Sequence, residues 1–375
     1  MKTLLNVFRI DYEKNRLYGL DILRALAVLF VVLGHGSKLL FPTINRLTFY
    51  VEFDGVAIFF VLSGFLIGGI LIKVLEKEQA SYKTLFNFWV RRWFRTLPNY
   101  FLVLLVLLIL SYLFIDGFAP FAGYKYFLFT QNLYTPHPAW FPEAWSLSVE
   151  EWFYLLVPVI VFGLVGMCKV ITNKAVLWTS IFVLVLMTLI RVYRYVEIPV
   201  HSFEDWDAIF RRQVLTRLDS LMFGLIGAYI SYYHKQLWIK HKTPLFILGI
   251  VLFLLIKYAD RYHMHTFGLY QCVFSFSLAS FATLILLPFL SQLKSGKGVV
   301  FKSFTYISLI SYSMYLLHFS VIQKWIINNL DLGVLPAYAR ISAKYVLYWV
   351  LTILISLLMF KYFERPIMKL RERFS

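Results

Sequence analysis

The sequence contains little charge and almost no cysteine for its length. Of its 375 residues, 15% are charged and 60% are hydrophobic, and the mean hydropathy is +0.70. In soluble domains about a quarter of all residues are charged. This composition therefore excludes a soluble protein and indicates a chain that crosses the membrane several times. The two cysteines, Cys168 and Cys272, lie far apart and outside any motif, which excludes a disulfide framework and a metal–thiolate site. No other pattern predicts a bound metal.

The sequence also shows no sign of a linker, a repeat, a second domain or a cleaved signal peptide. There is no low-complexity linker, no clear repeat and no room for a second soluble domain, so residues 1–375 are predicted to form one transmembrane domain. The N-terminus does not resemble a cleaved signal peptide, because a polar lead of nearly twenty residues precedes an apolar run of span length. The net charge of +17 is typical of topology signals and of contact with anionic lipid headgroups, and it predicts no nucleic-acid partner.

The apolar runs predict an all-α bundle of about ten membrane spans. The expected spans are 19–40, 53–75, 97–115, 145–166, 176–196, 214–233, 245–258, 269–291, 304–327 and 341–363. With the N-terminus inside, the inner segments hold 23 of the 37 Lys and Arg residues. This positive-inside pattern predicts that the N-terminal segment 1–18 and the C-terminal tail 364–375 are both cytoplasmic. The motif Phe-Glu-Arg-Pro at 363–366 is expected to stop the last helix.

The stretch 19–40 carries two ionisable residues inside a predicted span, Arg24 and His35. They are eleven positions apart, which is close to three helical turns, so both side chains share one face about 16 Å apart along the axis. A charge inside a membrane span normally faces the bundle interior or a watery cavity and marks function. The alternative is that Arg24 reaches to the interface and His35 is a buried helix contact.

Three loops stand out. The inner loop 76–96 ends with Arg91, Arg92 and Arg95, which predict either a phosphate site or a topology anchor. The outer loop 116–144 combines aromatic residues with Gln131, Asn132 and His137, a mixture that suits a sugar as well as an interfacial belt. The outer loop 197–213 mixes both signs of charge and is expected to be a solvated cap.

Two adjacent carboxylates, Glu150 and Glu151, lie at the start of the fourth span. They point about 100° apart on a helix, so only one is expected to face inward. Glu150 is expected at a depth similar to that of His35, where a carboxylate would fix the tautomer of the imidazole and raise its basicity. The alternative is a satisfied buried polar pair or an interfacial Glu.

Two further spans carry polar residues. Arg217 and Asp219 open the sixth span, where they either contact a substrate or simply pair with each other. His318 lies in the outer half of the ninth span, and taken alone it is typical of a hydrogen-bonded helix contact.

Seven segments occur in a characteristic order along the chain: LDILRALAVLFVVLGH, GVAIFFVLSGFLIGG, RRWFRTLP, WSLSVEEWFYLLVP, RLDSLMFG, ISYSMYLLH and FERP. Together they cover nearly the whole sequence, and in this order they resemble the membrane-bound acyltransferase family 3. Members of this family O-acylate polysaccharides, lipopolysaccharide, peptidoglycan and related glycans or small lipids. The resemblance implies a bundle of about ten helices, an acyl-CoA donor on the cytoplasmic side and acyl transfer at the outer face.

The family motifs fall on named residues of this chain. The essential Arg-x10-His motif falls on Arg24 and His35. The arginine motif falls on Arg91, Arg92 and Arg95, and the glutamate of the WSLxxE motif falls on Glu150, with Ser146 and Ser148 near it. Longer relatives carry a fused extracytoplasmic hydrolase-like domain that this sequence does not contain. This leaves open whether the chain completes the transfer alone or hands the acyl group to an extracytoplasmic partner protein.

These observations predict a multi-pass O-acyltransferase of the inner (cytoplasmic) membrane that uses acetyl-CoA and acylates an extracytoplasmic glycan. His35 would be the general base or a transient acyl carrier, and Glu150 would orient it. The arginines Arg24, Arg91, Arg92 and Arg95 would bind the CoA phosphates. The candidates for substrate contact are Ser146, Ser148, Tyr154, Arg217, Asp219 and His318. The alternatives are a transporter of a sugar- or lipid-linked substrate, which would be expected to show an inverted repeat, and a non-catalytic envelope partner.

Overall fold

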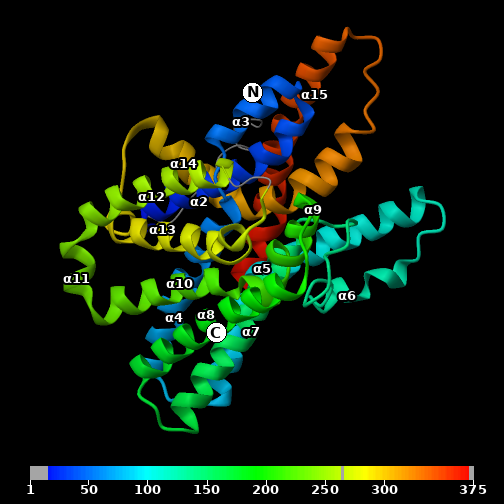
Figure 1. Ribbon diagram of the computed structural model, residues 1–375. Helices are drawn as coiled ribbons and strands as arrows, with labels where there is room; N and C mark the ends of the chain where they lie inside the picture. Colours follow the sequence, from blue (N-terminus) through cyan, green and yellow to red (C-terminus); the bar gives the residue numbers. More distant parts are fainter. Residues whose placement is uncertain (1–15, 263–265, 371–375) are drawn as a thin grey trace.

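The computed structural model describes residues 16–262 and 266–370 of the chain. These residues form helices joined by short connections, and no strand occurs in either range (Figure 1). The prediction of a cytoplasmic N-terminal segment falls mostly on residues 1–15, and the end of the predicted C-terminal tail falls on 371–375. Both of these segments lie outside the described residues.

Ten helical stretches are long and apolar enough to cross a membrane, which confirms the predicted all-α, multi-pass architecture. Their main helices are α2 (Tyr18–Gly36), α4 (Gly55–Lys77), α5 (Tyr82–Phe114), α7 (Ala144–Gly166), α8 (Thr172–Glu197), α10 (Val214–Tyr233), α12 (Lys242–Tyr262), α13 (Ser275–Leu290), α14 (Gly298–Leu317) and α15 (Ala337–Met359). The short predicted span 245–258 is extended by the structure at both ends, as α12.

Shorter helices connect or extend these spans. The short α-helices are α3 (Pro42–Val51), α6 (Tyr124–Phe127), α9 (Phe203–Trp206), α11 (Lys235–Lys240) and α16 (Arg365–Leu370). The 3-10 helices are η1 (Ser37–Leu39) and η2 (Pro120–Gly123), and the π-helices are η3 (Asp207–Arg211), η4 (Tyr270–Phe274), η5 (His318–Ile327) and η6 (Phe360–Glu364). Wide π-helical turns are rare and often mark functional sites.

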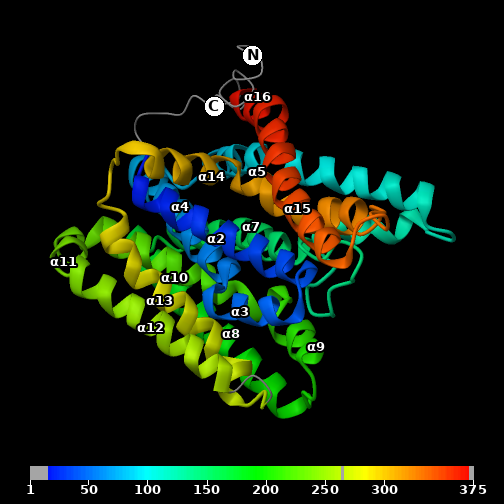
Figure 2. The ribbon, with the colours of Figure 1, turned by 90° about the horizontal axis from the view of Figure 1, so that it is seen from above.

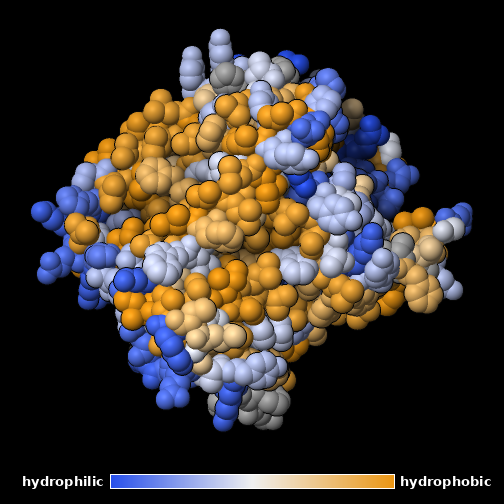
Figure 3. Space-filling model, turned by 60° about the horizontal axis from the view of Figure 1, so that its bottom comes forward, coloured by the Kyte–Doolittle hydropathy of each residue, from blue (hydrophilic) through white to orange (hydrophobic). Residues whose placement is uncertain are grey.

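The helices form a central group and a surrounding layer. Buried residues make up more than half of the apolar windows of α2, α4, α10, α13 and α14, and less than half of those of α5, α7, α8, α12 and α15. Figures 1 and 2 show α12 beside α13 at one edge of the bundle and α15 at the opposite edge. Figure 3 shows a continuous apolar area across the face that it displays, with hydrophilic residues along its margins. This surface suits the hydrocarbon of a bilayer, and the protein is a multi-pass membrane protein.

Helices α4 and α10 cross at two glycines. A Cβ atom at Gly64 would lie 2.0 Å from the backbone oxygen of Leu221, and one at Gly224 would lie 2.1 Å from the backbone oxygen of Val61. Since backbone atoms cannot move aside as a flexible side chain can, only glycine permits this approach. The crossing fixes α4 in the centre of the bundle.

The predicted inner loop 76–96 is largely helical. Helix α5 begins at Tyr82, where the side chain of Ser81 accepts a hydrogen bond from the amide of Thr84, and it continues past Pro98 to Phe114. The hydropathy pattern placed the start of this span near residue 97 because the preceding residues include three arginines. In the structure these arginines belong to the helix and line a cavity beside it, so they did not need a loop.

The last span also continues beyond its predicted stop. Helical structure extends from α15 through η6 and α16 as far as Leu370. Pro366 is the second residue of α16, where a missing N–H is tolerated. Glu364, which was assigned to the tail, is buried and accepts hydrogen bonds from Asn99 Nδ2 and Ser313 Oγ, both at 2.7 Å. This carboxylate anchors the end of the last span to α5 and α14.

The predicted solvated cap at 197–213 is partly wrong. The side chains of Trp206, Asp207 and Phe210 in this segment are buried. Asp207 forms ion pairs with both Arg211 and Arg212. The mixed charge of the segment therefore pairs within itself, and its apolar residues pack against the bundle instead of facing water.

Candidate active site

A cavity of about 560 Å³ lies between α2, α4, α5, α7 and α14. Its wall follows α4 from Val56, in the first turn, to Glu78, directly after the last turn. These two residues are separated by about 33 Å of helix at 1.5 Å per residue. The hydrocarbon core of a bilayer is about 30 Å thick, so the cavity extends over most of the depth of the membrane.

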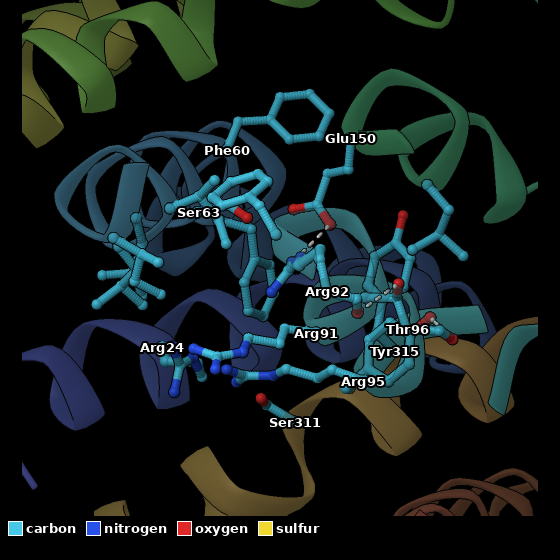
Figure 4. A pocket seen from close by; sticks show the side chains of 18 of the residues that line it. Arg24, Phe60, Ser63, Arg91, Arg92, Arg95, Thr96, Glu150, Ser311 and Tyr315 are labelled. Atoms are coloured by element: carbon cyan, nitrogen blue, oxygen red, sulfur yellow. Dashed lines mark hydrogen bonds and ion pairs between the residues drawn. The ribbon is translucent and has the colours of Figure 1, made fainter. Parts of the chain in front are cut away.

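Four arginines line this cavity, Arg24 from α2 and Arg91, Arg92 and Arg95 from α5. Figure 4 shows the side chains of Arg24 and Arg95 approaching each other near Ser311 of α14. Arg91 and Arg95 are four positions apart, so they share one face of α5, and both are exposed. The structure therefore brings all four predicted arginines together. Several guanidinium groups on one wall are well suited to grip phosphate oxygens.

Glu150 of α7 lines the same cavity and balances part of this charge. Its Oε2 lies 4.0 Å from Nη2 of Arg92 (Figure 4). Arg92 also donates a hydrogen bond to the hydroxyl of Tyr154, which lies 2.5 Å from Oγ of Ser63 on α4. A polar network therefore joins α4, α5 and α7 inside the cavity. Sequence reasoning missed Ser63, although it is a lone hydroxyl within the apolar stretch GVAIFFVLSGFLIGG.

The adjacent carboxylate of Glu151 points elsewhere. It is buried, and its Oε1 accepts a hydrogen bond from Oγ1 of Thr96 at 2.9 Å. Of the two glutamates, only Glu150 lines the cavity. The prediction that only one of them would face inward is therefore too simple: both carboxylates lie within the protein, and the 100° offset decides which one reaches the cavity.

The two histidines of the site form a direct pair. Nδ1 of His35 lies 2.7 Å from Nε2 of His318, and their rings stack with centroids 5.0 Å apart. The ring of Phe319 stacks on the ring of His35 at 4.5 Å. His318 is fully buried, whereas His35 is partly exposed. His318, which was predicted as a substrate contact, is thus the hydrogen-bond partner of His35.

The hydrogen bonds of His318 define the tautomers of this pair. Its Nδ1 lies 2.8 Å from the carbonyl oxygen of Tyr315 and 3.1 Å from that of Met314. Carbonyl oxygens only accept, so Nδ1 of the neutral ring carries the proton and Nε2 accepts. His35 must then donate through Nδ1, which leaves a lone pair on its Nε2. This is the nitrogen that a general base or nucleophile requires.

The predicted contact between Glu150 and His35 is corrected by this geometry. Glu150 faces Arg92, and the hydrogen-bond partner of His35 is His318. The prediction matched the depths of the two residues along their helices. Depth does not determine the direction in which a side chain points around the helix axis, and that direction separates Glu150 from the histidine pair.

Tyr315 separates the cavity from the histidine pair. Its hydroxyl lies 2.6 Å from Oγ of Ser146 and donates to the carbonyl oxygen of Glu143 at 3.1 Å. Tyr315 and Ser146 line the cavity, whereas neither histidine does. The ring of Tyr315 lies 5.9 Å from the ring of His318. The histidine pair therefore lies behind the Tyr315 side chain as seen from the cavity.

Ser148 lies away from the cavity. Its hydroxyl is buried and accepts a hydrogen bond from Nε2 of Gln131 at 2.5 Å. Asn132, beside Gln131, donates to the carbonyl oxygens of Trp145 and Arg212. These amides from the outer loop 116–144 hold the loop against α7, so the structure gives them a packing role in place of the predicted sugar contact.

Arg217 and Asp219 are buried, but they do not pair with each other. Asp219 forms an ion pair with Arg191 of α8 at 2.8 Å, and all of these side chains are inaccessible. The closest carboxylate to Arg217 is Asp54, at 3.8 Å. Residues two positions apart lie on different faces of a helix, which explains why each one finds a partner on another helix. Neither residue lines the cavity.

The described residues contain no group of three or more His, Cys, Asp or Glu side chains that could hold a metal ion.

Comparison with known proteins identifies relatives over nearly the whole chain. Residues 17–361 match the family described as an acyltransferase domain, type 3. The chain is 28% identical over 384 residues to the O-acetyltransferase OatA of Staphylococcus aureus strain NCTC 8325 / PS 47. The aligned region covers 96% of this chain and 58% of OatA. OatA of strain COL gives the same values. A further protein of strain COL, provisionally named an O-acetyltransferase, is 26% identical over 388 residues with the same coverage.

The chain thus spans little more than half the length of these curated relatives. No solved structure matches it. The family match begins before the first membrane-spanning helix and ends within the last one. It includes both members of the histidine pair and every residue that lines the cavity except Glu364. On this evidence the chain belongs to the membrane-bound acyltransferase family 3.

Proposed function

We propose that the protein is an integral-membrane O-acyltransferase of the cytoplasmic membrane. It transfers an acyl group, in the simplest case acetyl, from cytoplasmic acyl-CoA to a hydroxyl group of an extracytoplasmic glycan. One observation carries the proposal: a cavity lined by four arginines extends along α4 to Tyr315, next to the His35–His318 pair. The names of the curated relatives, which are O-acetyltransferases, favour acetyl-CoA as the donor.

The donor would bind with its phosphates at the arginines. Arg24, Arg91 and Arg95 would hold the phosphates of CoA, whose charge prevents it from entering hydrocarbon. The pantetheine arm is long and nearly uncharged, so it can follow the apolar wall that α4 provides. Helix α2 offers no such wall, because Arg24 is the one residue of α2 among the described residues that line the cavity.

Glu150 and Arg92 would bind the middle of the donor. They line the cavity with Ser63, and the buried hydroxyl of Tyr154 joins them to this serine. A carboxylate accepts hydrogen bonds and a guanidinium donates them, so this pair can satisfy the amides of the pantetheine arm. This role replaces the predicted orientation of His35 by Glu150.

His35 would carry the chemistry through Nε2. This nitrogen removes the proton of the acceptor hydroxyl while the hydroxyl oxygen attacks the thioester carbonyl. The carbon–sulfur bond then breaks, and the leaving thiolate takes the proton from His35, so that the products are an ester and free CoA. Alternatively, Nε2 itself attacks the thioester and holds the acyl group until the acceptor hydroxyl arrives. In both routes only the acyl group crosses from the cavity to the outer side.

The orientation of the chain is the first test of this proposal. In a Cys168→Ser background, single cysteines would replace Lys83, Lys297 and Thr135, three exposed residues. Lys and Arg accumulate in the segments assigned to the cytoplasm. We therefore expect an impermeant thiol reagent to label the cysteine at position 135 in intact cells and to label those at 83 and 297 only after the membrane is permeabilised. Labelling of both inner positions in intact cells would reverse the orientation and contradict the proposed direction of transfer.

The second test uses the purified chain in sealed proteoliposomes of known orientation. Acetyl-CoA is offered on the side of Lys83, and an oligosaccharide with free hydroxyl groups is offered on the side of Thr135. We expect O-acetylated oligosaccharide, detected by mass spectrometry, only when the donor is on the Lys83 side. Transfer by the purified chain would also show that no extracytoplasmic partner protein is needed. Transfer only when donor and acceptor share the Lys83 side would contradict transfer across the membrane.

A further inference from the structure

Glu143 forms a clamp on the helix that carries His318. This residue directly precedes α7 and is 2% exposed. Its Oε1 accepts a hydrogen bond from the backbone amide of Ser320 at 2.9 Å, and its Oε2 accepts one from the hydroxyl of Ser320 at 2.7 Å. A single buried carboxylate thus binds two donors of one residue on another helix. Sequence analysis gave Glu143 no role.

The clamp lies where the helix changes from α-helical to π-helical hydrogen bonding. The α-helix α14 ends at Leu317, and the π-helix η5 begins at His318. In α-helical register the amide of Ser320 would donate to the carbonyl oxygen of Leu316, four positions earlier. Here the Glu143 carboxylate is an acceptor for that amide. The carboxylate therefore stabilises the wider turn that starts at His318.

The same turn orients the imidazole of His318. Its Nδ1 is within hydrogen-bonding distance of the carbonyl oxygens of Tyr315 and Met314, and this contact assigns the proton to Nδ1. The carbonyl oxygen of Met314 also accepts the backbone amide of His318. In α-helical register the amide of Phe319 would compete for the carbonyl oxygen of Tyr315 in the same way. His318 would then lose its fixed tautomer, and His35 would lose the acceptor for its own Nδ1 proton. A hydrogen bond from one ring nitrogen raises the basicity of the other.

Glu143 makes one further contact with this helix through its backbone. Its carbonyl oxygen accepts a hydrogen bond from the hydroxyl of Tyr315. The residues that Glu143 holds, Tyr315 and Ser320, flank His318 on both sides along the chain. Neither contact involves the cavity arginines or Glu150.

We propose that Glu143 is a positioning residue that fixes the helical register at His318 and thereby keeps the lone pair of His35 on Nε2. As far as catalysis is concerned, this inference rests on the proposed acyltransferase function. The geometry of the clamp itself does not depend on it.

The carboxylate is not needed in its charged form for this role. Burial raises the pKa of Glu143 to about 7, although the hydrogen bonds from Ser320 oppose the shift. A neutral acceptor at this position can still receive the Ser320 amide. Glutamine, which is neutral and has an amide oxygen, is therefore the conservative replacement, and alanine is the disruptive one.

The test measures the reactivity of His35 in the purified, reconstituted full chain. Diethyl pyrocarbonate reacts with an unprotonated imidazole nitrogen, and mass spectrometry of the His35 peptide gives the rate. We expect Glu143→Ala to reduce this rate about tenfold and Glu143→Gln to retain most of it. The acetyl-transfer kcat should fall in parallel, by less than the 10²–10⁴-fold contribution typical of a general base, with an unchanged KM for acetyl-CoA.

Two further variants keep the experiment decisive. Ser111→Ala removes the acceptor of a 2.9 Å hydrogen bond from Nε1 of Trp140, which anchors the same loop to α5, and it should leave the His35 rate unchanged. If Glu143→Ala does not fold, Ser320→Ala removes one of the two clamp contacts and should lower the rate by about three- to tenfold.

Two outcomes would overturn the proposal. One is a folded Glu143→Ala protein whose His35 reacts at the original rate, and the other is a Glu143→Gln protein as impaired as the alanine variant. An unsubstituted protein that transfers no acetyl group would refute the proposed function instead. The comparison of His35 reactivity would then still test the clamp, because it requires no acyl transfer.

Discussion

Replacing His35 with alanine should abolish measurable acyl transfer and leave the binding of acyl-CoA nearly intact. His35 lies beyond Tyr315 and does not line the cavity in which the donor would bind. Its removal should therefore lower kcat without changing the affinity for the donor. A general base typically contributes on the order of 10²–10⁴ in rate, and loss of an acyl carrier would be at least as severe. The measurement is single-turnover acetyl transfer in proteoliposomes, together with equilibrium binding of acetyl-CoA.

The control for this experiment is His241→Ala. His241 is exposed and lies between α11 and α12, away from the cavity. This variant should transfer acetyl groups at the rate of the unsubstituted protein. If His35→Ala kept more than about a tenth of that rate, the residual rate would be far higher than the loss of a general base allows. His35 would then not be the reacting group. If it also lost donor binding, its role would be structural.

Replacing Arg91 and Arg95 together with glutamine should weaken acyl-CoA binding by two to four orders of magnitude. Each hydrogen bond to a charged group contributes about 1.5–3 kcal/mol, and the two residues lie on one exposed face of α5 within the cavity. Arg92 is left in place because its loss would leave Glu150 without a counter-charge. The affinity is measured by isothermal titration of the solubilised protein with acetyl-CoA, and the melting temperature is measured in parallel.

Lys83→Gln is the matched control, since Lys83 is an exposed cation on the same helix that does not line the cavity. It should bind acetyl-CoA as the unsubstituted protein does. An unchanged affinity in the double arginine variant would mean that Arg91 and Arg95 serve only as topology anchors. A large fall in the melting temperature would show instead that the two arginines stabilise the fold.

The membrane architecture could be predicted because it depends on local properties of the sequence. Long apolar runs identify spans whatever their neighbours are, and the structure has ten of them at the expected places. The errors arose where charged residues belong to a helix. The arginines of α5 and Glu364 were assigned to a loop and a tail, although each lines the cavity and forms part of a span.

The partners within the site could not be predicted, because they come from distant parts of the chain. His35 and His318 are 283 positions apart, and each was recognised separately. Helical periodicity places a residue on a face, but the neighbour of that face depends on how the helices pack. For the same reason Asp219 pairs with Arg191 and not with Arg217, which is only two positions away. Glu143 carried no periodic or motif signal that could have revealed its contact with Ser320.

The position of Tyr315 has a consequence for the energy supply of the cell. A membrane that stores a proton gradient must not contain a continuous file of water, because protons travel rapidly along such a file. The cavity follows α4 over most of the membrane depth but ends at Tyr315 and Ser146, whose hydroxyl groups are hydrogen-bonded to each other at 2.6 Å. In this structure a phenol ring held in this way closes the cavity towards the histidine pair, and in the proposed reaction it would move aside only while the donor arm fills the cavity. The cell could then modify its outer surface with a cytoplasmic metabolite without discharging the gradient.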